Sequence, residues 1–404
     1  MVSLKDIQEA AAVIKGRVIK TPLIHSPNLS RMTGAEVYLK LENLQETGSF
    51  KLRGATHKIH CRLKEIGTQG VVAASAGNHA QGVALAAKRA GFTSTIVMPE
   101  QASISKQQAT EGYGGRVILK GENIAESIQV ALELAEGGMM LIHPYDDPEI
   151  ISGQGTIGLE ILKELPEPDY LYVPIGGGGL MSGIATVFKD LSPRTRVIGV
   201  QTSACPSAFE SSRKGQVVRV EAARSIADGI AVKQVGEETF RIIREKVDDI
   251  VLVDEDRIAE AMLMLLERKK MIAEGAGAVP LAAFLHGPFS PPAGSRVVLV
   301  ISGGNVDSPL LDRVIRKGLF GRGRIMRVSV WLDDMPGALA ALLNLIASIK
   351  ANVLNIRHYR TGWDLPIYMS RVELELETRG VEHINEVHQT LQSAGYKFTL
   401  PRRE

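Results

Sequence analysis

The chain has 404 residues, more than one ordinary hydrophobic core holds and enough for two or three domains. Apolar residues make up 45% of the sequence and charged residues 23%, which argues against global disorder. The net charge of +2, with scattered lysines and arginines, argues against nucleic-acid binding by phosphate neutralisation. The two distant cysteines, Cys61 and Cys205, build neither a disulfide framework nor a metal cluster.

The first part of the chain alternates between short apolar strands and helices. An amphipathic helix is predicted over residues 3–16, and a strand over 35–41 leads to a lysine motif. Further elements are predicted as a strand at 71–74, a helix at 79–90, strands at 94–98 and 116–119, and a helix ending near 134. This alternation is typical of a parallel sheet covered by helices.

Prolines, aspartates and glycines cluster at residues 144–155, where we predict a loop and a boundary between subdomains. The alternation then resumes. Strands are predicted at 170–175, 197–200, 250–253 and 297–301, and helices at 180–191, 256–268 and 276–285. The predicted fold class is therefore α/β, with parallel-sheet cores.

Residues 321–324, Gly-Arg-Gly-Arg, are predicted to be a linker. The segment 325–404 then has its own pattern. Strands are predicted at 325–332, 353–359, 368–376 and 397–400, and helices at 338–349 and 383–394. The order βαββαβ indicates a compact ferredoxin-like unit.

The first sixteen residues carry charges and no apolar stretch, so we expect no signal peptide. No apolar run approaches the length of a membrane span. With the low cysteine content, these features favour a cytoplasmic protein with no membrane or nucleic-acid partner.

The motif Glu46-Thr47-Gly48-Ser49-Phe50-Lys51-Leu52-Arg53-Gly54 places a lysine at the start of a helical pattern, with Ser49 as its predicted N-cap. The positive end of the helix dipole should lower the pKa of Lys51. A neutral amine is what attack on a carbonyl requires. On spacing alone, a solvated surface lysine is the more common explanation of such a motif.

Three Gly-rich turns follow predicted strands. Residues Gly176, Gly177, Gly178 and Gly179 lie between a strand and a helix, and their N–H groups and the helix N-terminus suit a phosphate. The turn at 75–79 could hold a carboxylate, or could simply cap a helix with Asn78. In the turn at 302–305, Ser302 could face a ring nitrogen or be an ordinary turn residue. Glu274 and His143 also stand out, with structural roles equally open.

One cofactor uses a Schiff-base lysine, a phosphate cradle and partners for its ring oxygen and ring nitrogen: pyridoxal 5'-phosphate. The chain resembles the fold-type II pyridoxal-phosphate enzymes (tryptophan synthase β-like), and within them the threonine dehydratases, or threonine ammonia-lyases, over residues 1–318. The resemblance implies a catalytic domain at 1–320, with a small subdomain at about 44–143 inserted in a large one.

The resemblance assigns site residues by their match to the family motifs. Lys51 takes the Schiff-base role, Asn78 contacts the ring oxygen, and Ser302 faces the ring nitrogen. The cofactor-binding set is Phe50, Lys51, Asn78, Gly176, Gly177, Gly178, Gly179, Leu180 and Ser302. The substrate-binding set is Ser75, Ala76, Gly77, Asn78 and His79.

The implied reaction is the α,β-elimination of L-threonine to 2-oxobutanoate and ammonium. Alternatives within the family are an L-serine dehydratase, a serine racemase and a hydroxyaspartate dehydratase. Serine racemases carry a serine where Ala76 stands, and bind a divalent metal through two carboxylates where this chain has Gln201 and Ser207. These departures favour elimination and no divalent metal, with a monovalent cation left open.

The segment 325–404 resembles an ACT domain, a type that binds small effectors such as amino acids. Its ligand-binding turn would comprise Asp334, Pro336, Gly337, Ala338 and Leu339. Allosteric control follows from this resemblance, while a dimerisation module without ligand and a non-catalytic amino-acid sensor stay open. A homodimer or homotetramer is expected, and a role in isoleucine biosynthesis and a degradative role are both compatible with the sequence.

Overall fold

The computed structural model describes residues 1–363 and 365–400. The chain divides into two compact units, Met1–Leu310 and Leu311–Glu404. The division falls inside helix α13 (Ser308–Gly321), before the predicted linker at 321–324. Among the described residues, no helix combines the length and apolar character needed to cross a bilayer.

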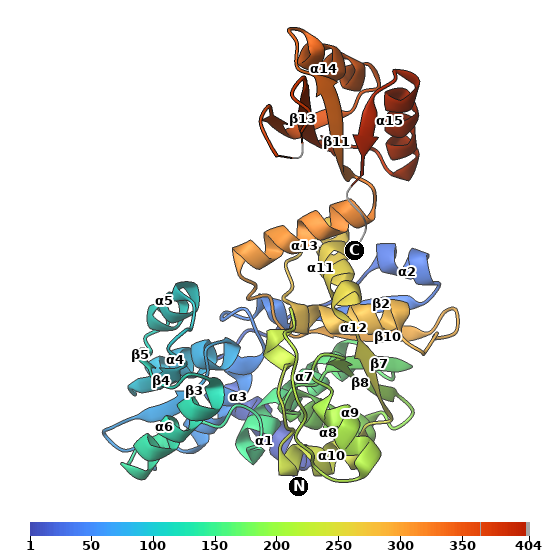
Figure 1. Cartoon of the computed structure of the whole chain (residues 1–404). Coiled ribbons are helices and arrows are strands. Elements are labelled where there is room, and N and C mark those ends of the chain that lie inside the picture. Colours follow the sequence, from blue (N-terminus) through green and yellow to red (C-terminus); the bar gives the residue numbers. More distant parts are fainter. Residues whose placement is uncertain (364, 401–404) are drawn as a thin grey trace. The chain divides into compact units, whose positions relative to one another are not determined.

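The first unit contains two separate sheets (Figure 1). The larger has the order β1-β2-β10-β7-β8-β9, with β1 antiparallel to β2 and the other neighbours parallel. Its strands are β1 (Leu23–His25), β2 (Glu36–Leu41), β7 (Tyr170–Pro174), β8 (Arg196–Thr202), β9 (Asp249–Val253) and β10 (Arg296–Ile301). The smaller sheet is parallel, in the order β5-β4-β3-β6. Its strands are β3 (Val71–Ala74), β4 (Ser94–Met98), β5 (Arg116–Leu119) and β6 (Met140–Leu141).

Helices cover these sheets, as the alternating pattern predicts. They are α1 (Leu4–Ile14), α2 (Pro27–Thr33), α3 (Lys51–Cys61), α4 (Asn78–Ala90), α5 (Ile104–Gly112), α6 (Ile124–Glu136), α7 (Pro148–Glu164), α8 (Gly179–Leu191), α9 (Ser207–Lys214), α10 (Glu237–Lys246), α11 (Glu255–Lys269) and α12 (Gly275–His286). Short 3-10 turns lie at Glu42–Leu44 and Asp228–Ile230. The α/β class with parallel-sheet cores is therefore confirmed.

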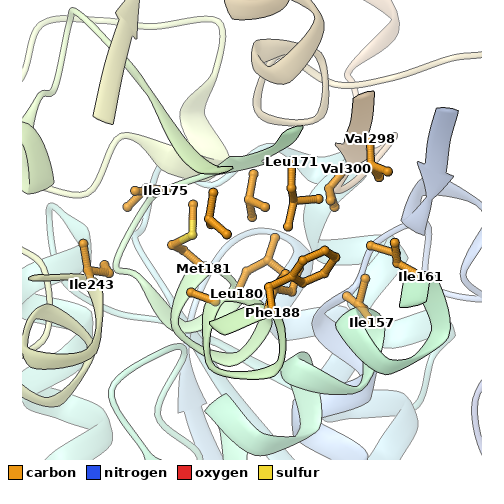
Figure 2. Close-up of a cluster of buried hydrophobic side chains, with 14 of the residues drawn as sticks. Ile157, Ile161, Leu171, Ile175, Leu180, Met181, Phe188, Ile243, Val298 and Val300 are labelled. Atoms are coloured by element: carbon orange, nitrogen blue, oxygen red, sulfur yellow. The ribbon is translucent and has the colours of Figure 1, made fainter. Parts of the chain in front are cut away.

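The core of the larger sheet lies between its strands and helices α7, α8 and α10 (Figure 2). Alternate residues of β7 and β10 point to this side, and Phe188 of α8 is fully buried beneath them. In the smaller sheet, Val71 and Ala73 face α3 and α4, whereas Val72 and Ala74 face α6. The inner strands β3, β4, β7 and β10 are buried on both faces, which explains why they are short and largely apolar.

The predicted loop at 144–155 is wrong from Pro148 onward, because α7 begins there. Asp147 caps this helix by accepting hydrogen bonds from the N–H groups of Glu149 and Ile150. The glycines that suggested a loop instead allow close helix packing. A Cβ on Gly153 would lie 2.7 Å from the Cα of Gly54 on α3.

The second unit has the βαββαβ order predicted for it. After α13 it contains β11 (Ile325–Asp333), α14 (Ala338–Ser348), β12 (Asn352–Tyr359), β13 (Met369–Glu377), α15 (Val381–Ser393) and β14 (Lys397–Thr399). The antiparallel sheet has the order β12-β13-β11-β14, and both helices pack on it through an apolar core. The ferredoxin-like prediction is confirmed.

A buried ion cluster lies behind α3. The guanidinium of Arg53 donates to both carboxylate oxygens of Glu42 at 2.8 Å, and to those of Glu160 at 2.7 and 2.9 Å. Lys40 donates to Glu160 and to the carbonyl of Thr21. Two cations and two carboxylates thus balance in a site where Arg53 and Glu42 are fully buried.

We predict that Arg53→Met lowers the free energy of unfolding by about 3–5 kcal/mol, because two carboxylates lose their buried partner. The measurement is a urea titration followed by far-UV circular dichroism. As a control, Arg194→Ala removes an exposed ion pair with Glu167 and should cause little change. A loss of less than about 1 kcal/mol for Arg53→Met would contradict the structural importance of the cluster.

Candidate active site

A cavity of about 1070 Å³ lies in the first unit where strands β3, β7 and β10 end. Every residue predicted to bind cofactor or substrate lines it: Phe50, Lys51, Ser75, Ala76, Gly77, Asn78, His79, Gly176, Gly177, Gly178, Gly179, Leu180 and Ser302. Segments far apart in sequence therefore meet at one site, as the carboxyl ends of parallel strands allow.

Lys51 is the first residue of α3, and its Nζ donates a hydrogen bond to the carbonyl of Pro144 at 2.8 Å. Burial of the amine lowers its pKa to about 8, although the nearby Glu274 opposes this change. The lowered pKa agrees with the prediction, but its largest cause is burial. The predicted N-cap is wrong: the hydroxyl of Ser49 is buried without a hydrogen-bond partner, and Phe50 precedes the helix.

The glycine turn offers unpaired donors. Within the described residues, the N–H groups of Gly176, Gly177 and Gly178 donate no hydrogen bond, and α8 starts at Gly179 without a side-chain cap. Gly178 has φ +101°, a conformation that favours glycine. Free N–H groups at a helix N-terminus are suited to an anion.

Packing also requires these glycines. A Cβ on Gly177 would lie 2.2 Å from the ring of Tyr145, and a Cβ on Gly178 would lie 2.7 Å from Thr239. The Tyr145 ring thus supports one side of the turn. No signal in the sequence singled out Tyr145, because it lies in the segment predicted as a loop.

Asn78 is held by two polar partners. Its Nδ2 donates to Glu274 at 2.7 Å, and its Oδ1 accepts from Asn305 at 2.7 Å. Since an amide nitrogen carries two hydrogens, Asn78 keeps one donor for a ligand. Burial, together with the charge of Asp228, raises the pKa of Glu274 to about 8.

His79 is also within the cavity wall, but its ring is committed to the scaffold. Its Nε2 lies 2.8 Å from the carbonyl of Ile142, and burial lowers its pKa to about 3. A neutral ring that donates to a backbone carbonyl fixes the start of α4 against β6. His143 has a similar role, since its Nδ1 accepts from the N–H groups of Tyr145 and Asp146.

Ser302 follows β10 and joins this strand to the lysine motif. Its carbonyl accepts from the N–H of Phe50 at 3.1 Å, while its buried hydroxyl donates weakly to the carbonyl of Ala276 at 3.4 Å. The hydroxyl is therefore available to a better acceptor. Sequence reasoning missed a further contact at the cavity wall, the ion pair between Lys106 and Asp228 at 2.9 Å.

Gln201 and Ser207, the two positions that the resemblance to serine racemases singled out, serve the scaffold. Gln201 accepts from the N–H groups of Ala208 and Phe209 at the start of α9, and Ser207 donates to the carbonyl of Val232. Across the described residues, no group of three or more histidines, cysteines or carboxylates could hold a metal ion.

In the second unit, the turn predicted to bind an effector joins β11 to α14. Asp334 accepts three hydrogen bonds from Arg360, at 2.9, 3.1 and 3.3 Å. Gly337 has φ +88° and precedes the helix, Pro336 is exposed, and Ala338 and Leu339 pack on the apolar core. The described geometry thus leaves Gly337 and Pro336 open to solvent.

Comparison with known proteins shows the class. The family model described as pyridoxal-phosphate dependent enzyme matches residues 14–303. The chain belongs to this family, and its cofactor is pyridoxal 5'-phosphate.

Individual proteins and solved structures resemble this chain over most of its length. The chain is 48% identical over 401 residues to an L-threonine ammonia-lyase of Thermotoga maritima, covering 99% of this chain and 100% of that protein. A crystal structure of a threonine deaminase from T.th. matches with a TM-score of 0.71 and 42% identity, over 76% of this chain and 99% of that one. The structure of maize serine racemase matches with a TM-score of 0.74 and 36% identity, over 79% of this chain and 98% of that one.

The residues of the cavity fit this cofactor. The unpaired N–H groups of the glycine turn suit its phosphate, and the enclosed amine of Lys51 suits its aldehyde. Asn78 has a free donor and Ser302 a weakly engaged hydroxyl. The cavity therefore has a suitable side chain or backbone group for each polar part of pyridoxal 5'-phosphate.

We predict that the Lys51 amine of the cofactor-free protein titrates with a midpoint near pH 8, because burial disfavours its charged form. The neutral amine should gain reactivity as the pH rises and reach a plateau above the midpoint. Competitive acylation with acetic anhydride, read by peptide mass spectrometry, measures this directly. A midpoint above about pH 10, as for an ordinary lysine, would contradict the prediction.

We predict that Tyr145→Ala weakens pyridoxal-phosphate binding roughly tenfold, because the glycine turn loses the ring that supports it. Titration of the cofactor-free protein, followed by absorbance, gives the affinity. Tyr145→Phe is the matched control and should bind within about twofold of the wild type, since the hydroxyl only approaches the carbonyl of Gln234 at 3.4 Å. Equal losses in both variants would assign the effect to the hydroxyl.

Proposed function

We propose that this protein deaminates L-threonine to 2-oxobutanoate and ammonium by α,β-elimination. The observation that carries the proposal is the shared cavity of Lys51, the glycine turn and Ser302, with the amine pKa lowered to about 8. The similarity to an L-threonine ammonia-lyase over nearly the whole chain supports this substrate.

Four contacts would hold the cofactor: the Lys51 amine, the N–H groups of Gly176–Gly179, the amide of Asn78 and the hydroxyl of Ser302. Phe50 and Leu180 would enclose it, as both line the cavity. When bound, pyridoxal phosphate supplies an electron sink for the pair left at the substrate α-carbon.

Lys51 then acts as the general base that removes the α-proton. Its burial keeps a large fraction of the amine neutral near pH 8, and the Pro144 carbonyl orients it through one N–H. The Ser302 hydroxyl would be a neutral partner for the ring nitrogen and would add no charge to it. The cofactor would then be a weaker electron sink, which would suit prompt elimination.

The turn Ser75–Asn78 would bind the substrate carboxylate. The helix α4 starts at Asn78 without a side-chain cap, so its first N–H groups are available to an anion. Gly77 is preorganised by its N–H bond to the Ser75 hydroxyl at 3.2 Å. His79 would contribute through the backbone, because its ring is bound to Ile142.

Ala76 lines the cavity without a hydroxyl. It therefore lacks the group that would handle a proton on the face opposite Lys51, which favours elimination over racemisation. The runner-up functions are those of an L-serine dehydratase, a serine racemase or a hydroxyaspartate dehydratase. The similarity to maize serine racemase keeps racemisation as the alternative to be tested.

The test is an oxoacid-release assay on L-threonine, L-serine and 3-hydroxyaspartate, with chiral analysis of the remaining serine. We expect L-threonine to be turned over best, and Lys51→Ala to lose about 10³-fold or more because both base and cofactor anchor are gone. Circular dichroism of Lys51→Ala controls for folding. D-serine as the main product, or unchanged activity of Lys51→Ala, would reject the proposal.

The second unit would regulate this reaction as an ACT domain. Its βαββαβ fold and the turn at 334–339 support the binding of a small effector, such as isoleucine or valine. Such regulation is a coupling free energy between two sites, so it must be reciprocal. We further expect a cytoplasmic homodimer or homotetramer, with the catalytic domain ending near residue 320 and the regulatory domain beginning at 325.

We predict that isoleucine or valine changes the threonine deamination rate of the full chain, and that removal of residues 325–404 abolishes the response. The basal rate should persist, because every cavity residue lies in the first unit. Initial rates at several effector concentrations measure this. An identical response in the truncated protein, or none in the full chain, would refute effector control through this unit.

A further inference from the structure

Glu274 is a carboxyl group in the wall of the Lys51 cavity, and the reaction proposed above gives it no role. It is 5% exposed and directly precedes α12, but its side chain does not cap that helix. Among the described residues its carboxyl forms one hydrogen bond, in which Oε1 accepts from Nδ2 of Asn78 at 2.7 Å. Because burial of a carboxyl costs free energy unless the group is hydrogen-bonded, this single contact is informative.

The turn after β10 makes room for this contact. A Cβ on Gly303 would lie 2.2 Å from Oε1 of Glu274 and 3.3 Å from Nδ2 of Asn78. The carbonyl of Gly303 also accepts from the N–H of Glu274 at 3.1 Å, which fixes the backbone that carries the carboxyl. A residue without a side chain at position 303 therefore leaves the hydrogen bond between Glu274 and Asn78 undisturbed.

The orientation of the Asn78 amide is set from both ends. An asparagine amide can turn over and exchange its oxygen and nitrogen with little change in shape, so its partners must distinguish the two. Asn305 is oriented by the carbonyl of Thr47, which can only accept, and its Nδ2 also donates to Oδ1 of Asn78 at 2.7 Å. Glu274 accepts at the other end of the amide. The reversed amide would set the NH₂ groups of Asn78 and Asn305 against each other.

We propose that Glu274 is a positioning residue, which holds the Asn78 amide so that its second N–H faces the ring oxygen of the cofactor. This role rests on the contact between Asn78 and the cofactor that is part of the proposed function. Nδ2 carries two hydrogens, and the bond of one to Glu274 fixes the direction of the other. A neutral carboxyl and a carboxylate both offer an accepting oxygen, so the role requires an acceptor and no charge.

The test titrates the cofactor-free full-length chain with pyridoxal phosphate and records affinity and the absorption spectrum, which responds to the state of the ring oxygen. Glu274→Ala should weaken binding about five- to tenfold and change the spectrum, because the amide loses an orienting hydrogen bond. Glu274→Gln is the matched control, since it keeps an accepting oxygen, and its affinity should stay within about twofold of wild type. Gly303→Ala keeps the carboxyl but displaces it from Asn78, so it should reproduce the loss.

A double-mutant cycle separates an effect through Asn78 from a direct effect on the cofactor. Asn78→Ala should weaken binding about tenfold, and Glu274→Ala should add less than about twofold in that background. Additive losses, equal losses in Glu274→Gln and Glu274→Ala, or wild-type affinity of Glu274→Ala would overturn the role of Glu274 alone. Unchanged affinity of Asn78→Ala would reject the Asn78 contact as well. No readout requires turnover, so the result is independent of the substrate, and circular dichroism controls for folding.

Discussion

The site depends on hydrogen bonds to the backbone that tie the lysine motif to the end of β10. The N–H of Phe50 donates to Ser302, the N–H of Gly304 donates to Gly48 at 2.9 Å, and the amide of Asn305 donates to the carbonyl of Thr47 at 2.7 Å. These bonds join the start of α3, which belongs to the smaller sheet's layer, to a strand of the larger sheet. Without them Lys51 and Ser302 would have no fixed relation, and each would be an ordinary turn residue.

The hydrogen bonds between these segments enclose the cavity, and this enclosure determines the pKa values of the groups inside it. Lys51 and Glu274 lie in the same enclosed space, and burial moves both pKa values to about 8, one downward and the other upward. Burial disfavours charge on each group, so near neutral pH Glu274 is largely protonated. A protonated carboxyl beside Asn78 can hold the amide without placing a full negative charge in the cavity. At that pH the Lys51 amine is still largely protonated, and its reactive neutral fraction grows as the pH rises through 8.

Glycine has two uses in this fold, and they overlap in the phosphate turn. Gly176–Gly178 leave their N–H groups unpaired, as an anion site needs, yet Gly177 and Gly178 also make room for Tyr145 and Thr239. Gly153 on α7 serves packing alone, since it meets the backbone of α3. Glycine content alone cannot separate these two uses. Clustered glycines therefore led to a correct prediction of the turn at 176–179 and to the wrong prediction of a loop where α7 lies.

The sequence by itself determined the alternating strands and helices, the βαββαβ unit at the end of the chain, the lysine motif and the three Gly-rich turns at 75–79, 176–179 and 302–305. These features are local, because hydrophobic period and turn chemistry act over a few residues. Only the tertiary structure decided that Tyr145 supports the glycine turn, that Asn78 is held by Glu274 and Asn305, and that Ser49 is buried instead of capping α3. The physical reason is that burial and contacts between distant segments arise only when the sheets close around the cavity, and no periodicity in the chain encodes them.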